Sequence, residues 1–372
     1  YKEALLLAEV GALLHDMGKC CDVHIETTSA NGQRKWSNPH AYKAVLDDPR
    51  SVIQLSKEAA SLRKPDVLNN VLKAQSPKIS DFLPESMKDI LASQGISLDS
   101  TIYTLAELIM LGTPGFAAHQ HRERLLEGKD GWLPAVLGVC HHEAHHDKQD
   151  PDEGEQSLPN VLMSDAFGYE KQSFILGDPH ESLDARLRSL LLSPDALKDL
   201  RTLKANIGET FSYGLGDTRR PINEVSLADW ASLVAALFKP ALAVLAIHPR
   251  KANIRQWLSW KDKVMDHDLR WRLLRVNFDV LGLYNKALKI TDLLGYQDKV
   301  NEACRAVKQL VEEEYPLGNE VYRDTTGIYF TFPDLALPAE LERLIRNRVA
   351  QVELELAPRI CVGQGNGKTA TE

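Results

Sequence analysis

Residues 13–19 read Leu-Leu-His-Asp-Met-Gly-Lys and place a histidine and an aspartate at the end of an apolar segment. Apolar residues recur at helical spacing over residues 2–20, which predicts a long buried helix. The adjacent pair His15 and Asp16 would need compensation for the water lost on burial. Because imidazole nitrogens and carboxylate oxygens bind divalent ions, the pair is a candidate metal site. Lys19 follows His15 by one helical turn, within reach of a substrate phosphate. The alternative is that the pair only caps the helix.

A second group of metal-binding residue types lies further along the chain. Residues 140–146 read Cys-His-His-Glu-Ala-His-His near the end of another predicted helix. Asp165 follows on a helix that we predict from about Leu158. A mixed nitrogen and oxygen site for one or two metals suits attack of a metal-activated water on a phosphate ester. The candidate metal ligands are His15, Asp16, His119, His121, His141, His142 and Asp165.

Residues 142–146 also satisfy the zinc-protease pattern H-E-x-x-H, in which Glu143 would be the general base. That pattern needs a helix through both histidines and a third ligand, for which Glu170 is a candidate. A charge-rich segment containing Pro151 begins directly afterwards, and the protease interpretation does not explain the earlier His-Asp pair. We therefore favour the phosphoester interpretation.

The LLHDMGK stretch, the paired histidines and the later aspartate together resemble the HD superfamily of metal-dependent phosphohydrolases. This resemblance implies an all-helical domain that uses Mn, Mg, Ni or Co to hydrolyse phosphoesters. Its signature pair matches His15 and Asp16, and its later elements match, in chain order, His119 or His121, His141 or His142, and Asp165. The catalytic residues it implies are His15, Asp16, Lys19, His141, His142 and Asp165. Many members carry a further upstream histidine, which the 14 residues before His15 lack.

The C-terminal third has a different pattern. Residues 272–278 form a strand-like run, and a helix is predicted from about 281 to 314. Two strand-like runs, residues 318–323 and 328–332, flank Asp-Thr-Thr-Gly, which has the composition of a hairpin turn. A last amphipathic helix is predicted at about residues 338–349. A strand, a helix and a hairpin in this order resemble the palm of polymerases and cyclases.

An HD domain followed by a palm resembles the large subunit of type III CRISPR effector complexes, over roughly residues 3–335. The resemblance implies an RNA-guided antiviral complex whose HD domain cuts single-stranded DNA. Its partners would be the small and backbone subunits, with guide and target RNA bound through other subunits. Palms of this family make cyclic oligoadenylates from ATP, and Asp279 and Asp324 are the candidate nucleotide-binding carboxylates. Active palms carry Gly-Gly-Asp-Asp in the hairpin, so we expect this palm to be degenerate.

The composition supports a globular, cytoplasmic protein. The 372 residues include 44 Lys and Arg and 52 Asp and Glu, for a net charge of −8, and 44% are hydrophobic, which excludes a disordered or collagen-like chain. Five cysteines without a CxxC pair predict no disulfide framework. No apolar run reaches the roughly 20 residues of a membrane span. Because the sequence begins at Tyr1 and not at Met, we interpret it as part of a longer protein.

The predicted fold class is multidomain and mainly α. An all-helical HD domain spans residues 1–180, a helical connector residues 181–268, a ferredoxin-like α+β palm residues 269–357, and a flexible tail residues 358–372. Basic residues and tryptophans alternate over residues 250–275, which suits a nucleic-acid backbone or, as we favour, docking within the protein. Two alternative functions remain open: a stand-alone HD nucleotide phosphohydrolase, and an inactive scaffold subunit that binds RNA and partner proteins.

Overall fold

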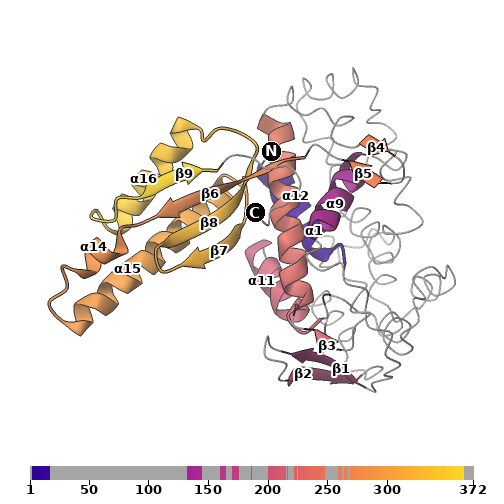
Figure 1. Ribbon diagram of the computed structural model, residues 1–372, viewed down its shortest axis with the longest axis horizontal. Helices are drawn as coiled ribbons and strands as arrows, with labels where there is room; N and C mark the ends of the chain where they lie inside the picture. The colour runs from indigo at the N-terminus through magenta and orange to yellow at the C-terminus, as the bar shows by residue number, and fades with distance from the viewer. Residues whose placement is uncertain are drawn as a thin grey trace. The chain divides into compact units, whose positions relative to one another are not determined.

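The computed structural model divides the chain into two units (Figure 1). The C-terminal unit comprises Tyr1–Leu6, Ala236–Asn253 and Asp268–Glu372, and the N-terminal unit comprises Leu7–Ala235 and Ile254–His267. The residues that the structure describes are 2–16, 132–144, 160–164, 170–175, 186, 200–214, 216, 222–223, 225–247, 259–261, 264–266 and 269–363.

The C-terminal unit is built on a four-stranded antiparallel sheet with the strand order β7-β8-β6-β9. Its strands are β6 (Trp271–Asn277), β7 (Glu320–Asp324), β8 (Gly327–Pro333) and β9 (Arg359–Val362). Its helices are α14 (Val280–Tyr284), α15 (Ile290–Gln309), the π-helical turn η6 (Leu310–Glu314) and α16 (Ala339–Val352). The chain order βαββαβ with this strand order is the ferredoxin-like arrangement. The predicted strand, hairpin and last helix are confirmed.

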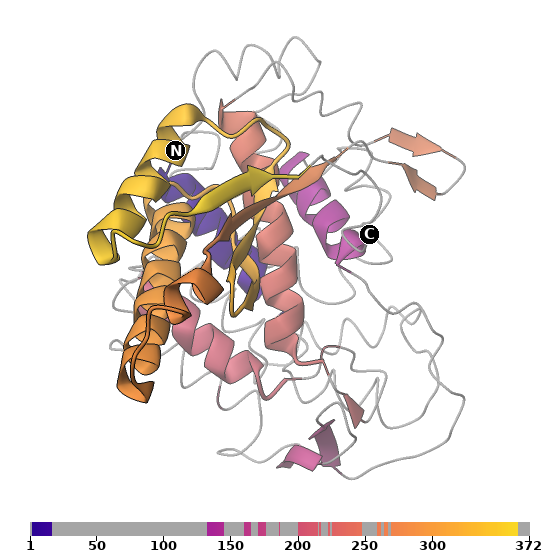
Figure 2. The same cartoon turned by 60° about the vertical axis from the view of Figure 1, so that its left-hand side comes forward.

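The core of this unit lies between the sheet and the helices α15 and α16, which Figures 1 and 2 show on one face of the sheet. Alternate residues of β8 point into it, because side chains of a strand alternate between faces. Helix α16 contributes residues spaced by four, which lie along one stripe. The central residues of this core are Ile328, Phe330, Phe332, Cys304, Val307, Leu341, Ile345 and Val349.

The opposite face of the sheet is partly covered by helix α12 (Leu227–Ile247), through the part that begins at Ala236. The Thr331 hydroxyl donates a hydrogen bond of 2.6 Å to the Ala236 carbonyl, and the Trp271 indole donates one of 2.7 Å to the Leu237 carbonyl. Trp271 therefore docks within its own unit, as the sequence favoured for the tryptophans of residues 250–275.

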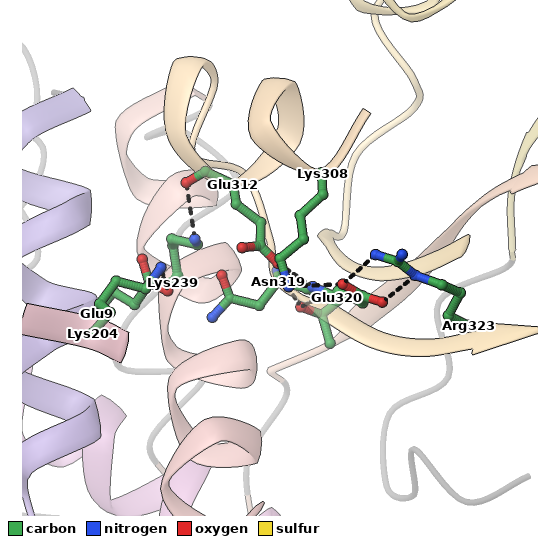
Figure 3. A network of polar contacts seen from close by, with 9 residues as sticks. Glu9, Lys204, Lys239, Lys308, Glu312, Asn319, Glu320 and Arg323 are labelled. Atoms are coloured by element: carbon green, nitrogen blue, oxygen red, sulfur yellow. Dashed lines mark hydrogen bonds and ion pairs between the residues drawn. The ribbon is translucent and has the colours of Figure 1, made fainter. Parts of the chain in front are cut away.

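A polar network ties η6 to β7 (Figure 3). The fully buried Lys239 donates from Nζ to the Glu312 carbonyl at 3.2 Å, and Oε1 of Glu312 accepts the backbone N–H of Glu320 at 2.7 Å. The Glu320 carboxylate accepts hydrogen bonds from Lys308 at 2.7 Å and Arg323 at 2.8 Å. Burial raises the pKa of Glu320, but the hydrogen bonds and charges of Arg323 and Lys308 outweigh it, and the net pKa is lowered.

The N-terminal unit contains the first part of α12 and most of α1 (Lys2–Leu14). Its other helices are α9 (Trp132–Glu143) and α11 (Leu200–Phe211), and its strands are β1 (Asn160–Ser164), β2 (Glu170–Ile175), β3 (Ile222–Asn223), β4 (Ser259–Lys261) and β5 (Val264–Asp266). Glu9 is buried in α1, and its charge is compensated by Lys204 of α11 at 2.6 Å.

The structure corrects four expectations. The predicted helical connector, residues 181–268, also contains the strands β3, β4 and β5. The helix predicted from about Leu158 is wrong, because residues 160–164 form β1, which pairs with β2, so the first 180 residues are not all-helical. A short apolar run such as Asn-Val-Leu-Met-Ser is too short for its pattern of apolar residues to distinguish a strand from a helix. The helix predicted over residues 281–314 is broken between Tyr284 and Ile290. Residues 359–362, predicted as the start of a flexible tail, form β9 beside β6.

Helix α12 contains the one stretch among the described residues, Leu227–Val244, that is long and apolar enough to cross a membrane. Within the protein, 78% of this stretch is buried. A buried core helix satisfies the same criterion of length and apolarity, so the stretch is weak evidence for a membrane span.

Candidate metal centre

The signature pair and the paired-histidine element come together in the N-terminal unit. His15 and Asp16 occupy the turn that follows α1, and His141 lies in the last turn of α9. His15 and Asp16 are each 2% exposed, whereas the side chain of His141 is 26% exposed. Small apolar residues on both helices, including Ala12 and Val139, are buried. The site is therefore largely closed, with His141 on its accessible side.

Three donor atoms of these residues form a compact triangle. Nε2 of His15 lies 2.8 Å from Nδ1 of His141 and 3.5 Å from Oδ2 of Asp16. Nδ1 of His141 lies 3.7 Å from the same oxygen. Among the described residues, this trio forms a group whose ligand atoms all lie within 4.8 Å of one another.

The chemistry and spacing of this triangle fit a divalent metal. Ligand atoms bound at about 2.0–2.2 Å to a tetrahedral ion are separated by about 3.3–3.6 Å. The separations of 2.8–3.7 Å lie around that range. Two neutral imidazoles with one carboxylate are a donor set used by Zn and by other first-row divalent ions. A bound cation would also offset the cost of burying Asp16.

The hydrogen bonds at His15 fix which of its nitrogens is available. Nδ1 of His15 lies 2.5 Å from the Ala12 carbonyl, and a carbonyl only accepts, so Nδ1 carries the proton. In neutral His15, Nε2 therefore has its lone pair toward His141 and Asp16. An orienting hydrogen bond of this kind on the distal nitrogen is typical of histidines that bind metals.

Trp230, which the sequence analysis did not include in the site, packs against His141. The two ring centroids lie 5.3 Å apart in an edge-on geometry. Trp230 stands in the first turn of α12, where Ser226 and Asp229 form a reciprocal cap: the Asp229 N–H donates to the Ser226 hydroxyl, and the Ser226 N–H and hydroxyl both donate to the Asp229 carboxylate. A Ser-x-x-Asp sequence before an apolar run is a signal of a helix start, but it does not indicate which residue the helix will contact.

Cys140 precedes His141 in α9 and is fully buried. Burial, followed by the charge of Glu143, raises the pKa of the Cys140 thiol well above its usual value. A thiol binds metals as the thiolate. Cys140 is not among the residues whose donor atoms converge with those of His15 and Asp16, so the described donor set consists of nitrogen and oxygen atoms.

The other candidate ligands are placed only in part. Lys19, His119, His121 and Asp165 lie outside the described residues, and only the backbone of His142, in α9, is described. Helix α9 ends at Glu143. The second histidine of the H-E-x-x-H pattern, His146, lies outside the described residues, and Glu170, its candidate third ligand, begins β2.

Asp279 and Asp324, the two candidate nucleotide-binding carboxylates, make local hydrogen bonds. Asp279 caps α14, because its Oδ1 accepts the Gly282 N–H at 2.9 Å, and a side chain at position 282 would collide with the carboxylate. Oδ1 of Asp324 accepts the N–H and the hydroxyl of Thr326, each at 2.7 Å. The hydrogen bond from the Thr326 side chain is the main cause of the lowered pKa of Asp324.

Comparison with known proteins gives matches at the level of structure. No protein-family model matches the chain, and no curated protein matches it. A structure described as a Csm1-Csm4 cassette in complex with cA3 aligns with 98% of this chain at 11% identity and a TM-score of 0.50. Structures of the cassette with cA4 and with pppApA align at 12% identity and TM-scores of 0.49 and 0.47.

The chain spans 45% of the length of each matched chain. At this identity the likeness bears on the fold, and it agrees with the resemblance that the sequence motifs indicate. The chain therefore shares the fold of part of a chain in the Csm1-Csm4 cassette.

Proposed function

We propose that this chain is a component of a cytoplasmic, RNA-guided type III CRISPR effector complex and that its HD site hydrolyses phosphodiester bonds in single-stranded DNA. The observation that carries the proposal is the convergence of His15, Asp16 and His141 from segments that are 126 positions apart. The likeness to the Csm1-Csm4 cassette supports the assignment to the complex.

In this proposal His15, Asp16 and His141 hold a divalent metal, with Asp165 and either His119 or His121 completing the ligand set. Such an ion lowers the pKa of water and stabilises negative charge on a phosphate. Asp16 supplies a formal negative charge, and the Ala12 carbonyl keeps the His15 proton on Nδ1. His142 and Lys19 would contact the phosphate that develops charge.

We assign no oligoadenylate synthesis to the C-terminal unit. The matched cassette binds cA3, but Asp324 is the only carboxylate in the hairpin turn of this chain, where the resemblance calls for two adjacent ones. Asp324 and Asp279 are also both engaged in local hydrogen bonds. In this proposal the unit serves assembly with the small and backbone subunits and with RNA.

The test is cleavage of end-labelled single-stranded DNA by the full chain with Mn²⁺, Mg²⁺, Ni²⁺ or Co²⁺. The wild type should cut the DNA, and the His15→Ala/Asp16→Ala variant should not. Asp298→Asn, which changes an exposed carboxylate on α15, serves as the control and should cut normally. Hydrolysis of mononucleotides without DNA cleavage would favour the stand-alone nucleotide phosphohydrolase. Absence of both activities and of metal binding would favour the inactive scaffold.

A further inference from the structure

The face of the C-terminal sheet opposite its helical core carries a row of aromatic and cationic side chains. The strand register places Tyr322 of β7 beside Tyr329 of β8, and Tyr329 beside Arg275 of β6. Their neighbours in sequence, such as Leu274 and Ile328, point into the core. Because side chains alternate along a strand, Tyr322, Tyr329 and Arg275 lie together on the other face. We call these three residues the stacking row.

The members of the stacking row contact one another and remain accessible. The guanidinium carbon of Arg275 lies 5.0 Å from the centroid of the Tyr329 ring, and the Tyr322 and Tyr329 centroids are 5.3 Å apart. Tyr322 is 57% exposed and Arg275 is exposed. A guanidinium over an aromatic ring keeps its in-plane N–H donors free.

The charges around the row favour an anionic ligand. Neither Arg275 nor Arg359 forms an ion pair within the described residues, and Arg359 of β9 lies beside Asn277 in the next row of the same face. The carboxylate on this part of the face is Asp324, which accepts the hydrogen bonds of Thr326 and also interacts electrostatically with Arg275 without forming an ion pair with it. Two exposed arginines are therefore available to phosphates.

We propose that the stacking row binds single-stranded nucleic acid, with bases stacked on Tyr322 and Arg275 and phosphates bound by Arg275 and Arg359. Aromatic rings and guanidinium planes accept any base, while arginines along the face follow the backbone. A solvated sheet face usually presents polar residues, whereas the part of this face that α12 leaves open exposes Tyr322 and Leu273, which is 48% exposed, and leaves Tyr329 partly accessible. The proposal does not depend on the metal site, because none of its residues is a candidate metal ligand.

The test is binding of the full chain to fluorescein-labelled 12-nucleotide oligo(U) and oligo(dT), measured by fluorescence anisotropy in EDTA so that no metal-dependent cleavage occurs. Tyr322→Ala should weaken binding about 5- to 150-fold, the effect of losing one stacked base. Arg275→Lys should also weaken it, because lysine keeps the charge but cannot stack. The matched control is Tyr315→Ala, which removes a tyrosine that is 44% exposed at the end of η6, and it should bind like the wild type.

A second readout locates the strand. Photocrosslinking of 5-iodouridine-substituted oligo(U), followed by mass spectrometry, should label peptides that contain Tyr322 or Tyr329. Equal affinity of wild type and Tyr322→Ala, or crosslinks confined to other peptides, would overturn the proposal. Equal competition by duplex DNA would reveal purely electrostatic binding, and full competition by ATP would reveal a mononucleotide site, and either result would also overturn it. If the stacking row does not bind oligonucleotides, the DNA cleavage assay with Mn²⁺ still tests the proposed function separately, because it probes the metal site.

Discussion

Nε2 of His15 and Nδ1 of His141 lie 2.8 Å apart, with Oδ2 of Asp16 within 3.7 Å of both. One of the two nitrogens must donate a proton to the other, and His15 already carries its proton on Nδ1. In the neutral pair His141 is therefore the donor, through Nδ1. For Nδ1 of His141 to bind an ion, its proton must first leave or move to Nε2.

We expect Asp16→Asn and His141→Ala each to weaken the binding of Co²⁺ or Mn²⁺ at least about tenfold, because each removes one donor of the triangle. Isothermal titration calorimetry on the full chain measures this affinity directly. Asp298→Asn is the control for loss of an exposed carboxylate. Wild-type affinity in both site variants would show that the triangle is a hydrogen-bonded helix end and not a metal site.

Trp230 should report on the ion and position its ligand. Its ring lies 5.3 Å from that of His141, so a paramagnetic ion bound at the triangle should quench its fluorescence. The Co²⁺-dependent part of the quenching should disappear in Trp230→Phe. Trp230→Ala should in addition change the visible spectrum of bound Co²⁺, because His141 loses the ring that orients it, whereas Trp230→Phe should largely restore the wild-type spectrum. Unchanged spectra in both variants would show that Trp230 only fills space.

The reactivity of the cysteine thiols should be lower where the side chain is buried. Cys140 and Cys304 are buried, and Cys361 is exposed. Burial is the main cause that raises the pKa of Cys304 to about 11, so only about a thousandth of its thiol is ionised at pH 8. Brief treatment with iodoacetamide at pH 8 should modify Cys361 and leave Cys140 and Cys304 unmodified, as measured by peptide mass spectrometry. Rapid modification of Cys304 would contradict its place in the core.

The network around Glu320 should stabilise the β7–β8 hairpin above pH 5 and lose this effect in acid. The pKa of Glu320 is lowered in the folded protein, so its contribution is complete above the unfolded pKa, about 4.3, and falls as the pH drops through the folded value. Glu320→Gln should therefore lower the stability of the hairpin by about 1 kcal/mol at pH 7.

Hydrogen exchange of the β7 and β8 amides measures this local stability. The difference between wild type and Glu320→Gln should shrink as the pH is lowered toward 3. Glu302→Gln, which removes an exposed partner of Lys299 at 2.9 Å, is the control and should have little effect at either pH. A variant effect that grows in acid would show that the Glu320 pKa is raised and not lowered.

The sequence predicts the elements in which apolar residues recur at a clear spacing or which a clear turn sequence precedes. Alternation at Ile328, Phe330 and Phe332, with Asp-Thr-Thr-Gly before it, is sufficient for the β7–β8 hairpin. Spacing by four at Leu341, Ile345 and Val349 is sufficient for α16. The break between α14 and α15 has no glycine or proline to mark it, because residues 285–289 read Asn-Lys-Ala-Leu-Lys. The Asp292 carboxylate, which accepts the N–H groups of Leu288 and Lys289, caps the start of α15 after the break.

The metal centre is predictable in part. The pattern of residues 13–19 identifies His15 and Asp16, and the resemblance to HD proteins adds a histidine of the 141–142 pair. His15 and His141 are 126 positions apart, and no local sequence pattern relates residues at that separation. Without the resemblance, their contact could not be predicted, because it depends on how the chain folds in three dimensions. The contact with Trp230 is of the same kind, because it depends on how α12 packs against α9.

The four-stranded sheet of the C-terminal unit can be completed only late in synthesis, because β9 is the last of its strands to be made. β6 is the first strand of the sheet to leave the ribosome, and it lies between β8 and β9. Its β8 edge is paired once the hairpin has emerged, but its other edge must wait for Arg359–Val362, the last strand that the structure describes. Until then the nascent chain presents unpaired N–H and C=O groups to its neighbours on the same messenger RNA. A chain that ended just before residue 359 would keep this edge of β6 unpaired permanently.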